Sequence, residues 1–151
     1  MPHPDRRRTD YRIFTDASFQ NPTLYAPAEP AGGGVFIMDK TQTLYTIISI
    51  QALLLQPTTP LHAEAQALLV AARLAVHLNC NHTTFYTDNQ ILATAAQLND
   101  PIKQPGHWMI RPMLQEFAAL LNTIEYKTSK IPRRYNSRAD RLAKRAKTGQ
   151  C

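Results

Sequence analysis

Short runs of β-branched and aromatic residues dominate the first third of the chain, and longer runs with helical spacing follow. The segment YRIFTDASF at residues 11–19 has the composition of a strand. Proline and glycine are frequent over residues 20–34, which predicts a loop or hairpin connection. Further strands are expected at 34–39 and 44–51, on either side of a turn at 39–43. The chain is therefore expected to open with a three-stranded antiparallel meander.

Strands and helices are expected to alternate in the rest of the chain. The segment LHAEAQALLVAARLAVHLN is rich in Ala and Leu over about five turns and gives the clearest helix. The elements expected after it are a strand at 82–89, a helix at 90–100, a helix at 107–123, a strand at 124–132 and a basic helix from Ser137 to Lys147. A meander followed by alternating strands and helices indicates an α/β fold in which helices pack on a mixed sheet.

Length and composition favour one domain. The chain has 151 residues, of which 44% are hydrophobic, and such a chain can enclose a core without disulfides or metals. We expect a basic extension at 1–10, the domain itself at 11–147 and a tail at 148–151. The chain has two cysteines, no charged-then-apolar leader and no apolar run of about 18 residues. We therefore expect an intracellular protein, nuclear or cytoplasmic, without a membrane partner. We also expect a monomer.

Positive charge points to a polyanionic partner. The formal net charge is +6, and the excess gathers at residues 6–8 and 127–147. A clustered basic surface favours nucleic acid, because neutralised phosphates release condensed counterions. A solvated basic helix face explains the charge alone equally well.

Four acids stand at positions with candidate chemistry. Asp16 interrupts the first strand, where Asp is disfavoured. Glu64 falls on the same helical stripe as Leu68, the stripe expected to be buried. Asp88 ends a strand, at the edge where sheets commonly hold functional groups, and Asp140 lies in the first turn of the last helix. A carboxylate that points inward needs a partner, and a cation is the simplest one.

Three of the acids also have structural explanations. Glu64 and Asp140 suit the first turn of a helix because of the helix dipole, and Asp88 can cap the helix that follows it. No cap or dipole accounts for Asp16. The joint pattern of strand Asp, helix Glu, strand-end Asp and helix Asp therefore carries more information than any single acid.

The segments FTDAS, HAEAQALL, YTDN and NSRADRLAKRA resemble the type 1 ribonuclease H family. The segments PLHAEAQALL, TDNQILA, PGHWMIRPMLQEF and KIPRRYNSRADRLAK resemble most closely the ribonuclease H domains of plant non-LTR retrotransposons. The resemblance implies a ribonuclease H-like fold, in which helices flank a five-stranded mixed sheet and the four acids meet at one edge.

The resemblance also implies an activity, namely hydrolysis of the RNA strand of RNA/DNA hybrids to 5′-phosphate and 3′-hydroxyl ends. Carboxylates suit Mg²⁺, a hard cation that takes oxygen ligands, and two such ions can serve both the attacking water and the leaving oxygen. By similarity Asp16 bridges both ions, Asp88 and Glu64 hold the ion on the leaving-group side, and Asp140 holds the ion that activates water. Mn²⁺ is the alternative metal, and a covalently linked reverse transcriptase is an implied partner.

Lys130 stands where many members of that family carry a catalytic-loop His, so we assign it a catalytic role in steadying phosphate. His107 is the alternative substitute for that His, and a structural role for His107 also stays open. The residues expected to contact nucleic acid are Ser18, Asn89, Gln90, Arg133, Arg134 and Asn136.

Two other interpretations compete with a ribonuclease H. One is a catalytically silent module that keeps the fold and binds nucleic acid. The other is a different nuclease of the same fold. Against it, a proofreading exonuclease would place an Asp-X-Glu in the first strand, where position 18 is Ser, and an integrase would end its acidic set with Glu, where position 140 is Asp.

Overall fold

The computed structural model describes residues 10–18, 31–41, 44–55, 59–98 and 110–148. Its strands are β1 (Asp10–Ser18), β2 (Ala31–Thr41), β3 (Leu44–Leu55), β4 (His82–Thr87) and β5 (Glu125–Lys130). Its helices are α1 (Pro60–His77), α2 (Gln90–Leu98), α3 (Arg111–Leu120), the short 3₁₀ helix η4 (Arg133–Tyr135) and α4 (Ser137–Thr148).

The strands form a mixed sheet in the order β3-β2-β1-β4-β5. The pairs β1–β2 and β2–β3 are antiparallel, and the pairs β1–β4 and β4–β5 are parallel. The predicted α/β fold with a mixed sheet and flanking helices is confirmed. Because β1 and β4 are parallel neighbours, their carboxyl ends lie at the same edge of the sheet.

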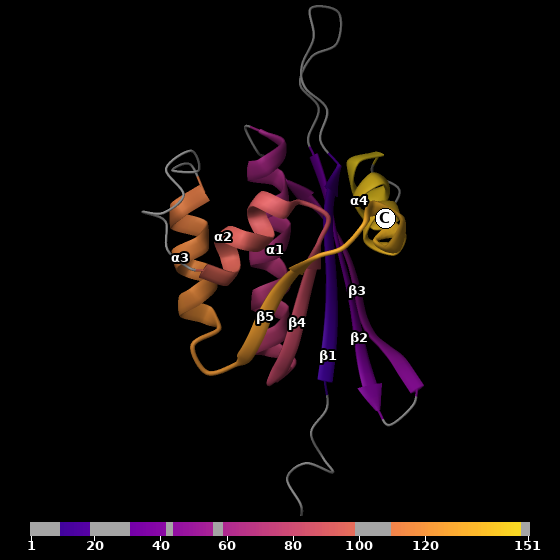
Figure 1. Ribbon diagram of the computed structural model, residues 1–151. Coiled ribbons are helices and arrows are strands. Elements are labelled where there is room, and N and C mark those ends of the chain that lie inside the picture. Colours follow the sequence, from indigo (N-terminus) through magenta and orange to yellow (C-terminus); the bar gives the residue numbers. More distant parts are fainter. Residues whose placement is uncertain (1–9, 19–30, 42–43, 56–58, 99–109, 149–151) are drawn as a thin grey trace, which may run out of the picture.

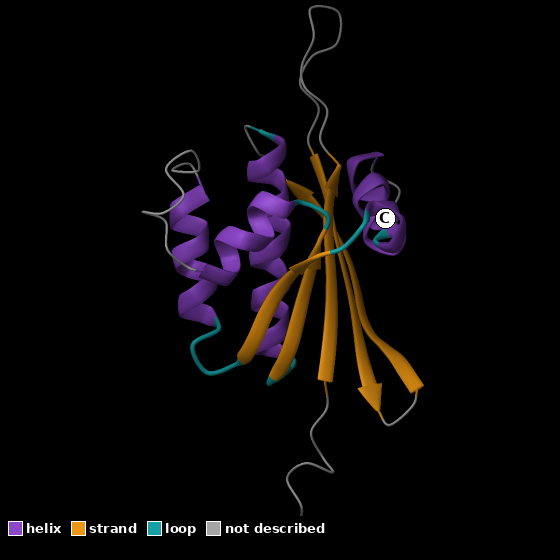
Figure 2. Ribbon diagram, in the orientation of Figure 1, coloured by secondary structure: helices purple, strands orange, loops and turns teal. Residues whose placement is uncertain are grey.

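Helices cover the two faces of the sheet unequally. Figure 1 shows α1, α2 and α3 together on one face and α4 on the other, and Figure 2 shows the same layers by secondary structure. The main core fills the space between the sheet and the three-helix layer, and it includes Ile13, Ile37, Leu68, Phe85 and Phe117. No helix in the described ranges is long and apolar enough to cross a membrane.

Local signals place the first and longest helix as expected. Thr59 is extended and its side-chain oxygen accepts a hydrogen bond from the backbone N–H of His62 at 3.0 Å, which caps α1. Pro60 follows in the first turn, where its missing N–H costs nothing. The predicted stripe faces the core, since Leu68, Ala71 and Ala75 are buried and its two ends, Glu64 and Leu78, are half-buried.

Several boundaries differ from the sequence prediction. The strand β2 begins at Ala31, so residues 31–34 are strand and the prediction of a loop there was wrong. The strand β5 ends at Lys130, and the unpredicted helix η4 occupies residues expected to be irregular. Residues 107–109 of the expected third helix lie outside the described residues, as do 1–9 of the predicted extension and 149–151 of the predicted tail.

Close packing of α4 explains why glycine can stand in a strand at position 34. A Cβ built on Gly34 would meet the carbonyl oxygen of Ala139, would lie 2.7 Å from the backbone N of Ala143, and would lie 2.8 Å from Cβ of Leu142. Two of these atoms belong to the helix backbone and cannot rotate away. Because Gly34 has no side chain, α4 can lie directly on β2. The glycine that suggested a loop in the sequence is therefore needed for the packing of this helix.

We predict that Gly34→Ala pushes α4 off the sheet and lowers the free energy of unfolding by about 1–3 kcal/mol, the usual cost of overpacking. Denaturant unfolding measures the loss, and hydrogen exchange should accelerate in α4 before it does in α1. Unchanged stability together with unchanged protection of α4 would contradict the close approach.

Candidate metal centre

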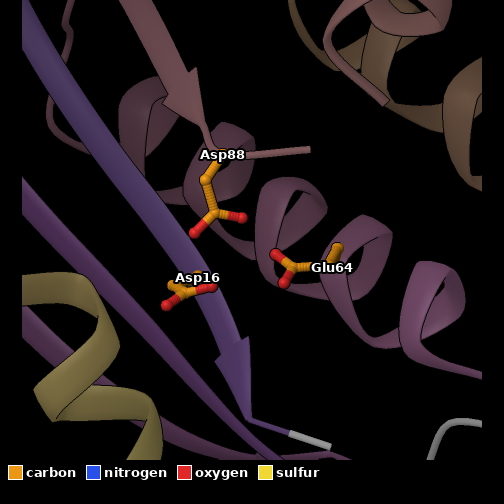
Figure 3. Close-up of side chains that lie close together, drawn as sticks. All are labelled: Asp16, Glu64 and Asp88. Carbon is orange, nitrogen blue, oxygen red and sulfur yellow. The ribbon is translucent and has the colours of Figure 1, made fainter. Parts of the chain in front are cut away.

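Three carboxylates from three elements meet at the carboxyl edge of the parallel strands. Phe14 of β1 pairs with Tyr86 of β4. Asp16 comes two residues after Phe14, and Asp88 comes two residues after Tyr86. Glu64 reaches the same place from the beginning of α1 (Figure 3). One oxygen from each of Asp16, Glu64 and Asp88 lies within 4.8 Å of the others. Acids separated by up to 72 positions in the sequence thus form one cluster.

Burial and mutual repulsion govern the protonation of this cluster. Asp16 is only 4% exposed. Its burial and, to a smaller extent, the charge of Asp88 raise the pKa of Asp16 to about 7. Burial, then the charges of Asp16 and Asp88, raises the pKa of Glu64 to about 10. The backbone N–H of Ala17 donates to Oδ1 of Asp16 at 2.9 Å, which opposes part of the rise. Without a cation, the cluster therefore holds protons at neutral pH.

The donor set fits a hard divalent cation. Oε2 of Glu64 is buried and has no hydrogen-bond partner. A buried carboxylate oxygen without a partner is costly, and it is directed into a group of other oxygens (Figure 3). All donors in the cluster are oxygens, which is the set that Mg²⁺, Ca²⁺ and Mn²⁺ prefer. These residues can therefore hold a divalent cation.

Asp140 lies beside this cluster and forms a different contact. A side-chain hydrogen bond links Asp140 to Asp16, and it contributes to the raised pKa of Asp16. The other neighbour of Asp140 is Lys144, one turn further along α4, whose Nζ is 3.0 Å from Oδ2. The sequence analysis missed Lys144 as a partner, although the i,i+4 spacing of Asp and Lys on a helix predicts such a pair.

Three residues predicted to contact nucleic acid lie at the end of β1 or just after β4, and two of them form local hydrogen bonds. Oδ1 of Asn89 accepts from the backbone N–H of Leu92 at 3.0 Å, which caps α2. Gln90 is exposed and donates to the hydroxyl of Thr94 at 3.0 Å. Ser18 is the last residue of β1 and is half-buried. All three lie close in sequence to an acid of the cluster.

The basic residues before α4 differ in exposure. Arg133 and Arg134 are exposed on η4, and Nε of Arg133 lies 4.0 Å from Oδ2 of Asp88. Asn136, in contrast, is 1% exposed, and its Nδ2 donates to the carbonyl of Thr15 at 2.8 Å. The side chain of Asn136 thus ties the beginning of α4 to β1 next to Asp16, and its contact with nucleic acid stays a prediction.

Lys130 occupies the end of β5 and not the loop before α4. Its side chain is exposed and lines a hollow of about 260 Å³ with Gln90, Thr94, Gln97 and Thr128. His107, the alternative, lies outside the described residues.

The sequence matches the family described as reverse transcriptase-like over residues 19–146. The chain belongs to this family. The predicted ribonuclease H-like membership is confirmed, and the closer similarity to plant retrotransposons stays a prediction. No curated protein gave a significant match.

Solved structures of ribonucleases H have the same fold. The N-terminal ribonuclease H domain of Rv2228c from Mycobacterium tuberculosis is similar at a TM-score of 0.77 and 20% identity, over 94% of this chain and 96% of that one. LC11-RNase H1, isolated from compost and solved in complex with an RNA/DNA hybrid, gives 0.73 and 22%, over 92% and 97%. The prototype foamy virus RNase H domain gives 0.65 and 17%, over 94% and 95%. The likeness establishes a ribonuclease H fold.

We predict that metal-free protein loses stability as pH rises. The pKa values of Asp16 and Glu64 are raised on folding, so the stabilising protonated forms are lost as pH passes through about 7, the pKa of Asp16, and then toward about 10. Thermal unfolding in EDTA should show Tm falling from about pH 5 to about pH 9, and Mg²⁺ should restore Tm most at the alkaline end.

The matched variant for that experiment is Asp88→Asn, which removes one of the repelling charges. It should flatten the fall of Tm with pH and reduce the gain from Mg²⁺. A native protein whose Tm neither falls with pH nor responds to Mg²⁺ would contradict the cluster.

We also predict that Asn136→Ala lowers the free energy of unfolding by about 1–3 kcal/mol, because it leaves the buried carbonyl of Thr15 without this donor. Asn122→Ala, at an exposed Asn, serves as the control and should change stability by less than about 0.5 kcal/mol. Equal stability of the two variants would contradict a structural role for the Asn136 hydrogen bond.

Proposed function

We propose that the protein is a ribonuclease H that hydrolyses the RNA strand of RNA/DNA hybrids with divalent metal ions. The observation that carries the proposal is the group formed by Asp16, Glu64 and Asp88, in which Oε2 of Glu64 is buried without a partner. Such a group is costly to the folded protein unless a cation joins it. The family and the fold indicate the class of reaction, and the three acids indicate where it takes place.

Within this proposal Asp16, Glu64 and Asp88 hold a divalent cation, and Mg²⁺ is the ion that suits them best. Bound Mg²⁺ lowers the pKa of water and offsets charge on the phosphate, and a second ion shares this task. Asp140, whose carboxylate is paired with Lys144, would hold that second ion. The products are RNA ends with 5′-phosphate and 3′-hydroxyl groups.

Substrate preference rests on the groups around the acids. LC11-RNase H1 was solved with an RNA/DNA hybrid, which makes a hybrid the first substrate to test for this chain. Arg133 is exposed beside Asp88, where a guanidinium can meet a phosphate. Ser18, Asn89, Gln90 and Arg134 are further candidate contacts to sugar or phosphate. Lys130, being an exposed point charge, is proposed to steady phosphate from the adjacent hollow.

A retroelement origin is part of the same proposal. A foamy virus protease–reverse transcriptase chain resembles this one over 22% of its own length, at a TM-score of 0.64 and 16% identity, so a domain of this fold occurs next to a reverse transcriptase. We propose that residues 11–147 act as such a domain, inside the cell and linked to a polymerase.

Cleavage assays test the activity. We predict that the native protein with Mg²⁺ cuts a labelled RNA/DNA hybrid and leaves double-stranded RNA and double-stranded DNA intact. Glu64→Gln and Asp88→Asn should each slow cleavage by ~100-fold or more, because a metal ion contributes several kcal/mol and each 1.4 kcal/mol is tenfold in rate.

The matched control is Glu116→Gln, which makes the same chemical change at a half-exposed residue of α3 and should cut at the native rate. Equal cutting of all three duplexes would exclude hybrid selectivity. Hybrid binding that needs no metal and leads to no cleavage would instead identify the silent nucleic-acid-binding module.

A further inference from the structure

Aromatic side chains form a ladder on the sheet face that carries α4. Phe36 pairs with Phe14 in the β1–β2 register, and Phe14 pairs with Tyr86 in the β1–β4 register, so all three side chains are on one face. The rings of Phe14 and Tyr86 are stacked at 4.9 Å between centroids, and those of Phe14 and Phe36 are 6.3 Å apart. The main core lies on the opposite face, so its packing does not account for this ladder.

Two residues of the ladder, Phe14 and Phe36, form part of the wall of a hollow of about 260 Å³. Phe14, Phe36 and Met38 line it from the sheet, and residues 134–139 of η4 and α4 form its other wall. A second hollow of about 190 Å³ shares Phe36 and Arg138 with the first and continues along α4 past Arg141. The two hollows are therefore neighbours along α4, with Phe36 and Arg138 in their shared wall, and together they are called the groove.

Arginine supplies the charge of this groove. Arg138, Arg141 and Arg145 follow one another at helical spacing on α4, and Arg134 precedes them on η4. The described residues that line the two hollows include neither Asp nor Glu. A groove with this charge suits an anion that extends along it, and a phosphodiester backbone is such an anion.

Ring faces and guanidinium groups already stack in the groove. The guanidinium carbon of Arg138 is 4.9 Å from the centroid of Phe36, and that of Arg134 is 4.8 Å from the centroid of Tyr135. Tyr135 is 63% exposed, the largest exposure among the large apolar side chains that the structure describes. An exposed ring beside arginines is the arrangement that proteins use to stack unpaired bases.

We propose that this groove binds single-stranded nucleic acid, with a base stacked on the exposed ring of Tyr135 and phosphates on the arginines of η4 and α4. A duplex keeps the faces of its bases stacked on each other, so only an unpaired strand can offer a base to this ring. The groove contains none of the three clustered acids and needs no metal. It is therefore a binding site beyond the proposed cleavage.

The groove and the metal centre share a border. Asn136 lines the larger hollow, and its side chain donates to the carbonyl of Thr15, which precedes Asp16. Arg133, next to Asp88, precedes Arg134 on the same short helix. A strand bound in the groove therefore lies close to the acids.

Fluorescence anisotropy with labelled oligo(U) and oligo(dT) of about ten nucleotides, in EDTA, tests the proposal. Tyr135→Leu should weaken binding by about fivefold or more, whereas Tyr135→Phe, which keeps the ring, should bind as the native protein does. Because Tyr135 is exposed, thermal unfolding should show both variants to be folded.

Salt dependence tests the phosphate contacts. Replacing Arg138 and Arg141 together by Gln should reduce the slope of log K against log salt by about 0.7 for each arginine, the value for single strands. Arg73→Gln removes one such charge from the opposite side of the sheet and should leave the slope unchanged.

Failure of this proposal is distinct from failure of the proposed activity. Asp88→Asn should abolish cleavage and retain oligonucleotide binding. The groove proposal is overturned by the absence of single-strand binding, by equal weakening in Tyr135→Phe and Tyr135→Leu, or by equal slopes in the α4 double variant and Arg73→Gln. Tighter binding of oligo(U) than of oligo(dT), or the reverse, would identify RNA or DNA as the strand recognised.

Discussion

Repulsion among clustered, largely buried carboxylates is the constraint on which the rest of this structure depends. Asp16, Glu64 and Asp88 lie on three separate elements, and only the sheet and the helix packed on it keep their oxygens within 4.8 Å. Raised pKa values are the measure of that cost, since burial and neighbouring charge both favour the proton over the carboxylate. A fold that holds such a group is suited to binding a cation, and this property links the architecture to metal-dependent chemistry.

The second constraint is the position of α4. Gly34 lets the helix backbone lie on β2, and Asn136 fastens its beginning to β1. The same helix then serves two purposes, because Asp140 on it reaches Asp16 while its arginines border the groove above Phe36. Packing of one short helix therefore decides both the fourth acid of the site and the shape of the basic surface.

Much of the fold follows from local pattern, and the errors have physical causes. The helical repeat that begins at residue 61, with Pro60 before it, forms α1 as predicted, although the helix ends at His77, two residues before the predicted end. Residues 31–34 are strand although their glycines favour a loop, because the close approach of α4 excludes a side chain at position 34. Asn is a residue type common in turns and at surface contacts, yet the side chain of Asn136 donates to the buried carbonyl of Thr15 in β1.

The sequence by itself determined the order and type of most elements, the acids with unusual placement and the excess of positive charge, because periodicity and composition are properties of the local chain. Tertiary structure alone decided which strands are neighbours, that Phe36, Phe14 and Tyr86 share one face in direct register, and how far the carboxylates are from each other. These features depend on contacts between residues that are distant in the sequence. The free energy of such contacts cannot be read from any short segment. The pKa values of Asp16 and Glu64 belong to the same class, since burial and neighbouring charge exist only in the folded chain.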